Sequence, residues 1–248
     1  MKKFVPGIVG LAALAMAAPA FAADLPPATY AKTVEPFYDW SGYYIGINIG
    51  GGWSHNCWTN TSFLGVATVP GVAEGCNTAT GGLAGGEAGY RWQVSSLVVG
   101  LESQGDWANL SASNASLFNF GTTNQTQTDA LGLLTGQIGY SWNNVLWYVK
   151  GGAALAHNTY NGLAAGAAFD QAAETRLGSA AGAGVEVGIT PNLSFALEYD
   201  HAFMGSQNLT FTAVPVAGIS RNDSINLGVD MVTARVNLHF GDPVVAKY

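Results

Sequence analysis

The sequence contains few charged residues. They make up 10% of the 248-residue chain, against roughly 25% in an ordinary soluble domain. A chain of about 200 residues cannot bury so much apolar surface in a single soluble core. The low charge therefore indicates an exterior that faces a medium other than water. The formal net charge of −7 also argues against nucleic acid as a partner.

Long apolar runs are also scarce. Beyond the N-terminal leader, no stretch reaches the roughly 18 apolar residues that a membrane-spanning helix needs. The leader has Lys2 and Lys3, then the apolar stretch Phe4–Ala18, and small residues that end at Ala22. This order is typical of a secretory signal peptide. We predict a signal peptide over residues 1–22, cleavage between Ala22 and Ala23, and export from the cytoplasm.

Catalytic motifs are missing as well. The sequence has no G-x-S-x-G, H-E-x-x-H or phosphate-binding loop. The glycine-rich stretch Thr80–Gly89 lacks the G-x-G-x-x-G spacing and a helix after it. Asp200 and His201 are neighbours in a predicted strand, so their side chains point to opposite faces and cannot form a dyad with each other. We predict no enzymatic activity and no cofactor.

Cysteine occurs only twice, at Cys57 and Cys76, within one long polar segment. In an exported protein such a pair predicts a disulfide. Closing a loop of about twenty residues would stabilise the fold by roughly 3 kcal/mol in the loop-entropy account. A metal site with His55 is the alternative, but two thiols and one imidazole fall short of the usual four ligands. We predict the disulfide and no metal site.

The sequence is rich in segments where apolar residues alternate strictly with small or polar ones, and the first is Trp40–Ser54. From Tyr43 to Trp53 every second residue is apolar, except Gly51, and the residues between are small or polar. A period of two predicts a half-buried strand. A face of glycine and asparagine suits a crowded polar interior, and the apolar face then suits lipid. Its length of about ten residues is what a tilted strand needs to cross a bilayer.

The same pattern recurs along the whole chain. The predicted strands are Trp40–Ser54, Thr80–Trp92, Leu97–Trp107, Ala130–Trp142, Val145–His157, Arg176–Ile189, Leu193–Phe203 and Ile225–Phe240. Long polar connections (Asn56–Ala79, Ala108–Gln127, Asn158–Thr175 and Gly205–Ser224) alternate with short turns such as Asn143-Asn144. An even strand number with alternating long and short connections is typical of outer-membrane barrels.

The fold prediction is an all-β, eight-stranded antiparallel up-and-down transmembrane barrel over residues 41–240. Its four long loops are extracellular and its short turns periplasmic. Residues 23–40 form a periplasmic N-terminal linker and 241–248 a C-terminal tail. Asp230 has the outward parity, so we expect a bulge or the membrane rim there. Aromatic side chains at strand ends predict girdles at the two membrane interfaces: Tyr43, Trp53, Tyr90, Trp92, Trp107, Tyr140, Trp142, Trp147 and Phe240.

Charged residues on the inward parity predict a lumen network of four acids and three bases: Glu87, Arg91, Glu102, Lys150, Glu186, Glu198 and Arg235. An eight-stranded barrel is just wide enough for its side chains to fill it, and buried charges must be paired. One interpretation is the charged constriction of a narrow pore. The other, which we favour, is an internal salt-bridge network that plugs the barrel.

Several segments together resemble one family. The leader, the ADLPP start, the strand DWSGYYIGINIGGGWS and the terminal strand ARVNLHF are similar to the outer-membrane immunogenic proteins, small OmpA-like and porin-like barrels of Gram-negative bacteria. The resemblance implies an abundant protein of the cell outer membrane without shared catalytic residues. It implies roles in surface integrity, recognition by hosts and, in some members, modest permeability.

We therefore expect a structural, surface-exposed envelope protein with a largely plugged lumen. A narrow passive porin for ions and very small solutes is the alternative, and an adhesin that binds host or matrix molecules through its loops is a second one. The expected partners are outer-membrane lipids, lipopolysaccharide and the barrel-assembly machinery. The expected state is a monomer.

Overall fold

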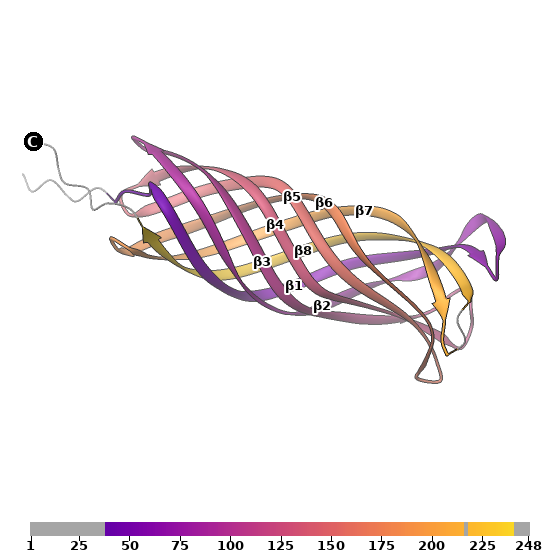
Figure 1. Cartoon of the computed structure of the whole chain (residues 1–248). Helices are drawn as coiled ribbons and strands as arrows, with labels where there is room; N and C mark the ends of the chain where they lie inside the picture. Colours follow the sequence, from indigo (N-terminus) through magenta and orange to yellow (C-terminus); the bar gives the residue numbers. More distant parts are fainter. Residues whose placement is uncertain (1–37, 216–217, 241–248) are drawn as a thin grey trace, which may run out of the picture. The chain divides into compact units, whose positions relative to one another are not determined.

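A computed structural model describes residues 38–215 and 218–240, which form eight long strands (Figure 1). Their bounds are β1 Gly42–Phe63, β2 Val66–Val94, β3 Leu97–Ala115, β4 Thr122–Trp142, β5 Val145–Ala164, β6 Ala167–Thr190, β7 Leu193–Ala213 and β8 Ile219–Phe240. The predicted signal peptide with its Ala22–Ala23 cleavage site, the linker up to residue 37 and the tail 241–248 lie outside the described residues.

The strands close into a ring. Each strand pairs antiparallel with the next along the chain, and β1 pairs with β8 to complete the barrel. That closing pair runs from Tyr43 opposite Phe240 to Phe63 opposite Arg221. The eight-stranded up-and-down barrel predicted from the alternation is confirmed. Among the described residues no helix is long and apolar enough to cross a membrane.

The turns differ between the two ends of the barrel. At one end the connections are two residues long, at Ser95-Ser96, Asn143-Asn144 and Pro191-Asn192, and Asn143 has the positive φ expected of a tight hairpin. At the other end most of each long connection continues the two flanking strands. Leu64-Gly65 and Ala165-Gly166, with φ between 47° and 83°, close two of these hairpins tightly. The strands therefore extend well beyond the stretches that the apolar alternation marks.

Alternation decides which side chains face outward. Ile47 and Leu134 on the apolar parity are 70% and 64% exposed, as expected for a lipid-facing surface. The predicted girdle residues are all exposed or half-exposed, and Tyr43, Tyr90 and Trp92 contact one another edge to face or tilted at the short-turn end. Asp230 itself keeps regular pairing with β1 and β7, and the nearest irregularity is a β7–β8 register shift between Phe203 and Gly205, opposite Gly228 and Leu227.

Inside the ring, an apolar layer crosses the lumen. Leucine, methionine, valine and alanine side chains from β2 to β8 contact one another, and each is at most 6% exposed. They are Ala79, Leu83, Leu110, Leu131, Leu133, Ala154, Ala156, Ala180, Ala202, Met204, Leu227, Val229 and Met231. Polar zones lie on both sides of this layer. The barrel therefore has a packed core of its own.

Cys57 and Cys76 form the predicted disulfide. They stand directly opposite each other on β1 and β2, beyond the apolar face that ends at Trp53. The bond closes the outer part of the first long hairpin, where Trp58–Thr59 and Asn60–Ser62 interrupt the β1–β2 register. It holds the two strands together where the ladder is least regular.

We predict that replacing both Cys57 and Cys76 with serine lowers the free energy of unfolding by up to about 3 kcal/mol. The barrel should still form, because β1 keeps its pairing with β2 below the disulfide. Urea unfolding followed by tryptophan fluorescence measures the loss, and heat-modified gel mobility reports the folded barrel. A variant that no longer folds would contradict this account.

Candidate functional site: the filled lumen

Two buried cations organise the polar zone on the short-turn side of the apolar layer, which we call the lower polar zone. The Lys150 Nζ lies 3.1 Å from Glu102 Oε1 and 3.3 Å from Asp200 Oδ1, and it also pairs with Glu198. The Arg235 guanidinium makes two bonds to Glu102, of 3.0 and 3.1 Å, and a further pair with Glu198. Both cations thus share the same two carboxylates, which come from β3 and β7.

Neutral groups complete these contacts. The Tyr44 hydroxyl donates to Glu102 Oε2 at 2.7 Å, and the Tyr148 hydroxyl donates to Glu198 Oε2 at 2.6 Å. Gln104 Oε1 accepts from both cations, at 3.3 Å from Lys150 Nζ and 2.5 Å from Arg235. Buried charges are tolerated when such hydrogen bonds satisfy them. The zone is a connected network spanning the lumen.

A second group closes the short-turn end. Arg91 pairs with Glu186 at 2.8 Å, and its guanidinium carbon lies 4.3 Å from the centre of the Tyr44 ring. Trp40, which precedes β1, is fully buried there. Its indole Nε1 donates to Ser141 Oγ at 3.0 Å and its backbone N–H to Gln93 Oε1 at 2.7 Å. The indole ring of Trp40, just before β1, is thus packed inside this mouth of the barrel.

All seven charged residues predicted for the lumen lie inside it and are at most 5% exposed. Glu87 is the least engaged, at 3.9 Å from the Arg235 Nε, and it accepts from Asn48 Nδ2 at 2.9 Å. Asp106 and Asp200 join the network on the same parity. Carboxyl groups therefore outnumber cations in the lumen by more than the predicted four against three.

A separate ionic cluster lies at the long-hairpin end, beyond the membrane-spanning part of the strands. Arg221 pairs with Glu74 at 2.7 Å, with Asp170 at 3.0 Å and with Asp223 at 3.3 Å. Its guanidinium carbon also lies 4.5 Å from the Phe211 ring centre. Each of these charged side chains is nearly fully buried. We call this set, Glu74, Asp170, Arg221 and Asp223, the upper ionic cluster.

The sequence prediction missed the upper ionic cluster because its residues fall in the segments assigned to loops. One signal was available. The inward parity of β8, read backward from Arg235, continues without a break to Asp223 and Arg221. A charge on that parity beyond the membrane would have suggested a filled lumen that extends outside the bilayer.

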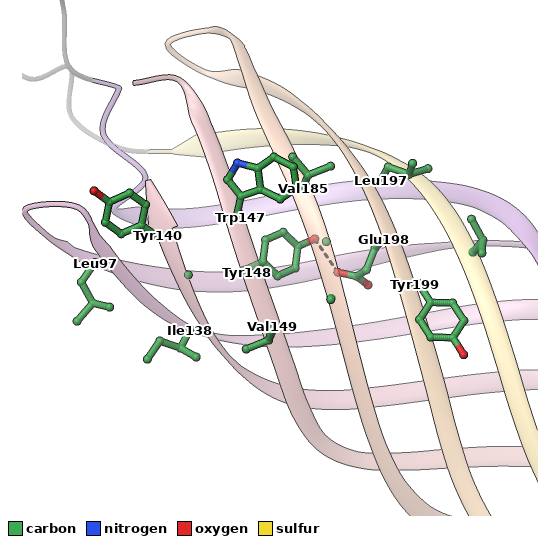
Figure 2. A pocket seen from close by; sticks show the side chains of 14 residues that line it. Leu97, Ile138, Tyr140, Trp147, Tyr148, Val149, Val185, Leu197, Glu198 and Tyr199 are labelled. Carbon is green, nitrogen blue, oxygen red and sulfur yellow. Dashed lines mark hydrogen bonds between the residues drawn. The ribbon is translucent and has the colours of Figure 1, made fainter. Parts of the chain in front are cut away.

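An apolar groove of about 800 Å³ lies on the outer face across β3 to β8 (Figure 2). Exposed side chains such as Tyr140, Trp147 and Tyr199 line it together with Gly139 and Gly184, and the buried Tyr148 and Glu198 border it from the lumen side. In a bilayer this groove faces acyl chains.

Asp200 and His201 are not partners, as predicted. His201 instead pairs with Asp230 at 2.7 Å on the outer face, and the Tyr199 hydroxyl donates to the same carboxylate oxygen at 2.5 Å. Asp200 points inward to Lys150. The outward Asp230 is thus covered by two neighbours, which explains how a charged residue occurs on this parity. No group of three or more metal-binding side chains is found in residues 38–215 and 218–240.

The closed ring, the apolar exterior with its aromatic ends and the many buried polar side chains of the interior define an outer-membrane β-barrel protein. The family described as outer membrane protein beta-barrel domain matches residues 8–240, and the chain belongs to that family. Its location is the outer membrane.

Named relatives agree with this assignment. The chain is 28% identical over 226 residues to the 25 kDa outer-membrane immunogenic protein of Brucella abortus biovar 1, covering 90% of this chain and 94% of that one. It is 28% identical over 246 residues to the 31 kDa outer-membrane immunogenic protein of Brucella melitensis, covering 94% and 98%. The resemblance inferred from the strand motifs is confirmed.

Among solved structures, the outer membrane protease OmpT of Escherichia coli matches with a TM-score of 0.50 and 8% identity, covering 80% of this chain and 96% of that one. At this identity the match concerns the fold alone.

We predict that Arg235→Met destabilises the barrel by about 3–5 kcal/mol, because it leaves Glu102 and Glu198 buried with Lys150 as the cation they share. Urea unfolding in lipid vesicles measures the loss. Adding Glu198→Gln to Arg235→Met should restore part of it, since one uncompensated charge is then removed. Equal stability of Arg235→Met and the parent would refute a structural role for the network.

The upper ionic cluster gives a pH-dependent prediction. Burial, helped by the nearby Glu74 and Asp170, raises the pKa of Asp223 from 3.8 to about 7 despite Arg221. Between pH 4 and 7 the folded form therefore keeps a proton that the unfolded chain has released, so stability falls as pH rises through this window.

Asp223→Asn should flatten that pH dependence and stabilise the protein at pH 8 by on the order of 1 kcal/mol or more. Urea unfolding at several pH values between 4 and 8 measures both slopes. An unchanged slope in the variant would show that Asp223 does not carry the effect.

Proposed function

We propose that this protein is a structural component of the outer membrane, with a sealed barrel that stabilises the envelope and displays four hairpins at the cell surface. One observation carries the proposal. The apolar layer, which includes Leu83, Leu131 and Met231, is closely packed inside the lumen, and the polar side chains beside it, such as Gln104 and Asp106, are buried as well. Water and ions cross a closely packed interior poorly, because it leaves no continuous space for them.

Two further features support a sealed barrel. The lower network joins opposite walls of the lumen, because Lys150 pairs with both Glu102 on β3 and Glu198 on β7. Trp40 then covers the short-turn mouth. A solute would have to break both before reaching the apolar layer.

The narrow-pore alternative rests on the charged lumen. Glu102 and Lys150 would be its constriction, and they do face the lumen. Their charges, however, are engaged with each other and with Arg235 and Glu198. The geometry therefore favours a plug, and the pore remains the second candidate.

We propose lipopolysaccharide and outer-membrane lipids as the partners of the apolar exterior, and the barrel-assembly machinery as the partner during insertion. We also propose that the protein acts as a monomer, because its closed ring leaves no strand edge to pair with another chain.

Planar-bilayer conductance of the refolded protein tests the proposal. The parent should give no stepwise current. Replacing Leu131 and Leu133 with serine should admit water to the apolar layer and produce measurable current. Leu134→Ser is the matched control, because Leu134 neighbours Leu133 but is 64% exposed on the outer face.

Steady stepwise current through the parent that shifts when Glu102 or Lys150 is neutralised would overturn the sealed barrel and establish the pore. A parent without current, together with a conducting double serine variant, would locate the seal in the apolar layer.

A further inference from the structure

The four hairpin tips at the extracellular end carry no charge. Residues 61–73, 115–123, 161–169, 212–215 and 218–220 contain no Asp, Glu, Lys, Arg or His. We call these four tips the crown. A surface bathed in water normally carries mixed charges, so a charge-free crown needs a physical reason.

The crown also exposes large apolar side chains. Six of them, drawn from three hairpins, are between 61% and 88% exposed: Leu64, Val66, Val69, Leu117, Phe120 and Ile219. Phe120 and Val69 are the most exposed, at 88% and 87%. These side chains stand on separate hairpin tips at the same end of the barrel.

Charged side chains lie near the crown, but they point into the barrel. The upper ionic cluster lies directly beneath the tips, and Glu74, Asp170 and Arg221 are all nearly fully buried. The same short stretch of barrel thus hides its ionic groups and presents its apolar ones. This is the reverse of the arrangement expected for a surface that only contacts water.

The tips are held in place before any partner arrives. The Leu64 backbone N–H donates to the Ser220 carbonyl at 2.9 Å, and the Val214 N–H donates to the Phe169 carbonyl at 2.8 Å. The Phe63 and Phe118 rings contact each other edge to face with centres 5.9 Å apart. Neighbouring hairpins are therefore tied together, which lowers the entropic cost of binding.

We propose that the crown docks onto an electrically neutral lipid bilayer apposed to the cell, inserting its exposed apolar side chains between the headgroups. A crown without charge fits a bilayer of zwitterionic lipids, and it has no cationic side chain with which to select anionic lipids. Single side chains that protrude from separate hairpins suit insertion into a soft interface. A protein partner would call for one continuous, complementary face.

This inference names the class of partner for adhesion through the loops, which is a neutral lipid bilayer. It does not depend on the sealed lumen: a conducting barrel would overturn the proposed function and leave the crown's role untouched.

Flotation of the full-length mature chain, held in nanodiscs, with phosphatidylcholine vesicles tests it. The parent should bind, and binding should change by less than about twofold between 0.05 and 0.5 M NaCl, because no surface charge is involved. Replacing Val69 and Phe120 with serine should weaken binding about tenfold or more. Ala168→Ser, at an exposed crown position, should bind like the parent.

Heat-modified gel mobility confirms that each variant is folded. Failure of the folded parent to bind vesicles would overturn the inference, as would binding that high salt abolishes or that the double serine variant retains. Pairs of nanodiscs that form without vesicles and disappear in the double serine variant would assign the crown to self-association, which also overturns it.

Discussion

The pairing of β1 with β8 is the contact on which the rest of the molecule depends. In a bilayer every backbone N–H and C=O must find a partner within the protein, and this pairing removes the two free edges that a linear run of eight strands would have. It extends over nearly the whole of both strands, from Tyr43 to Phe63. Closure fixes the register, and the register decides which residues share the lumen.

Once the ring is closed, the small lumen imposes the second constraint. Inward side chains on neighbouring strands must fit beside one another, which explains why glycine recurs on the inward parity. A Cβ at Gly46 would lie 2.0 Å from Asn237 Oδ1, and one at Gly182 would lie 2.0 Å from Asp200 Oδ1. Glycine at these positions leaves room for the long polar side chains that form the network. The charged and apolar zones are two ways of filling the same narrow space.

Period-two alternation was enough to predict the ring, the lipid-facing side and the inward position of residues such as Glu102 and Arg235. It could not predict contacts between distant walls, because those depend on the strand stagger, which the alternation leaves undetermined. The apolar layer was missed for a related reason. Leu131 and Leu133 are followed by a segment whose outward-facing residues are also apolar. Because leucine occurs at both inward and outward positions there, the sequence pattern did not show that these two side chains point into the lumen.

The upper ionic cluster shows a different limit. Polar, glycine-containing segments were interpreted as loops, because such residues are common in connections. They form strands here because each has a neighbour to pair with and an interior to fill, as Asn60 does by donating to Asp223. Tertiary context thus overrides local propensity. Neither the crown nor its charge-free character follows from the alternation of the membrane-spanning part.

The burial of cations has a practical consequence for handling the protein. Within residues 38–215 and 218–240, every lysine and arginine (Arg91, Lys150, Arg176, Arg221 and Arg235) is at most 5% exposed. Trypsin cuts after these two residue types, and amine-reactive labels need an accessible lysine. The folded barrel therefore offers trypsin no accessible bond in this part of the chain, whereas the unfolded chain offers five. Resistance to trypsin thus becomes a direct assay for correct refolding, and a surface label would have to use other chemistry.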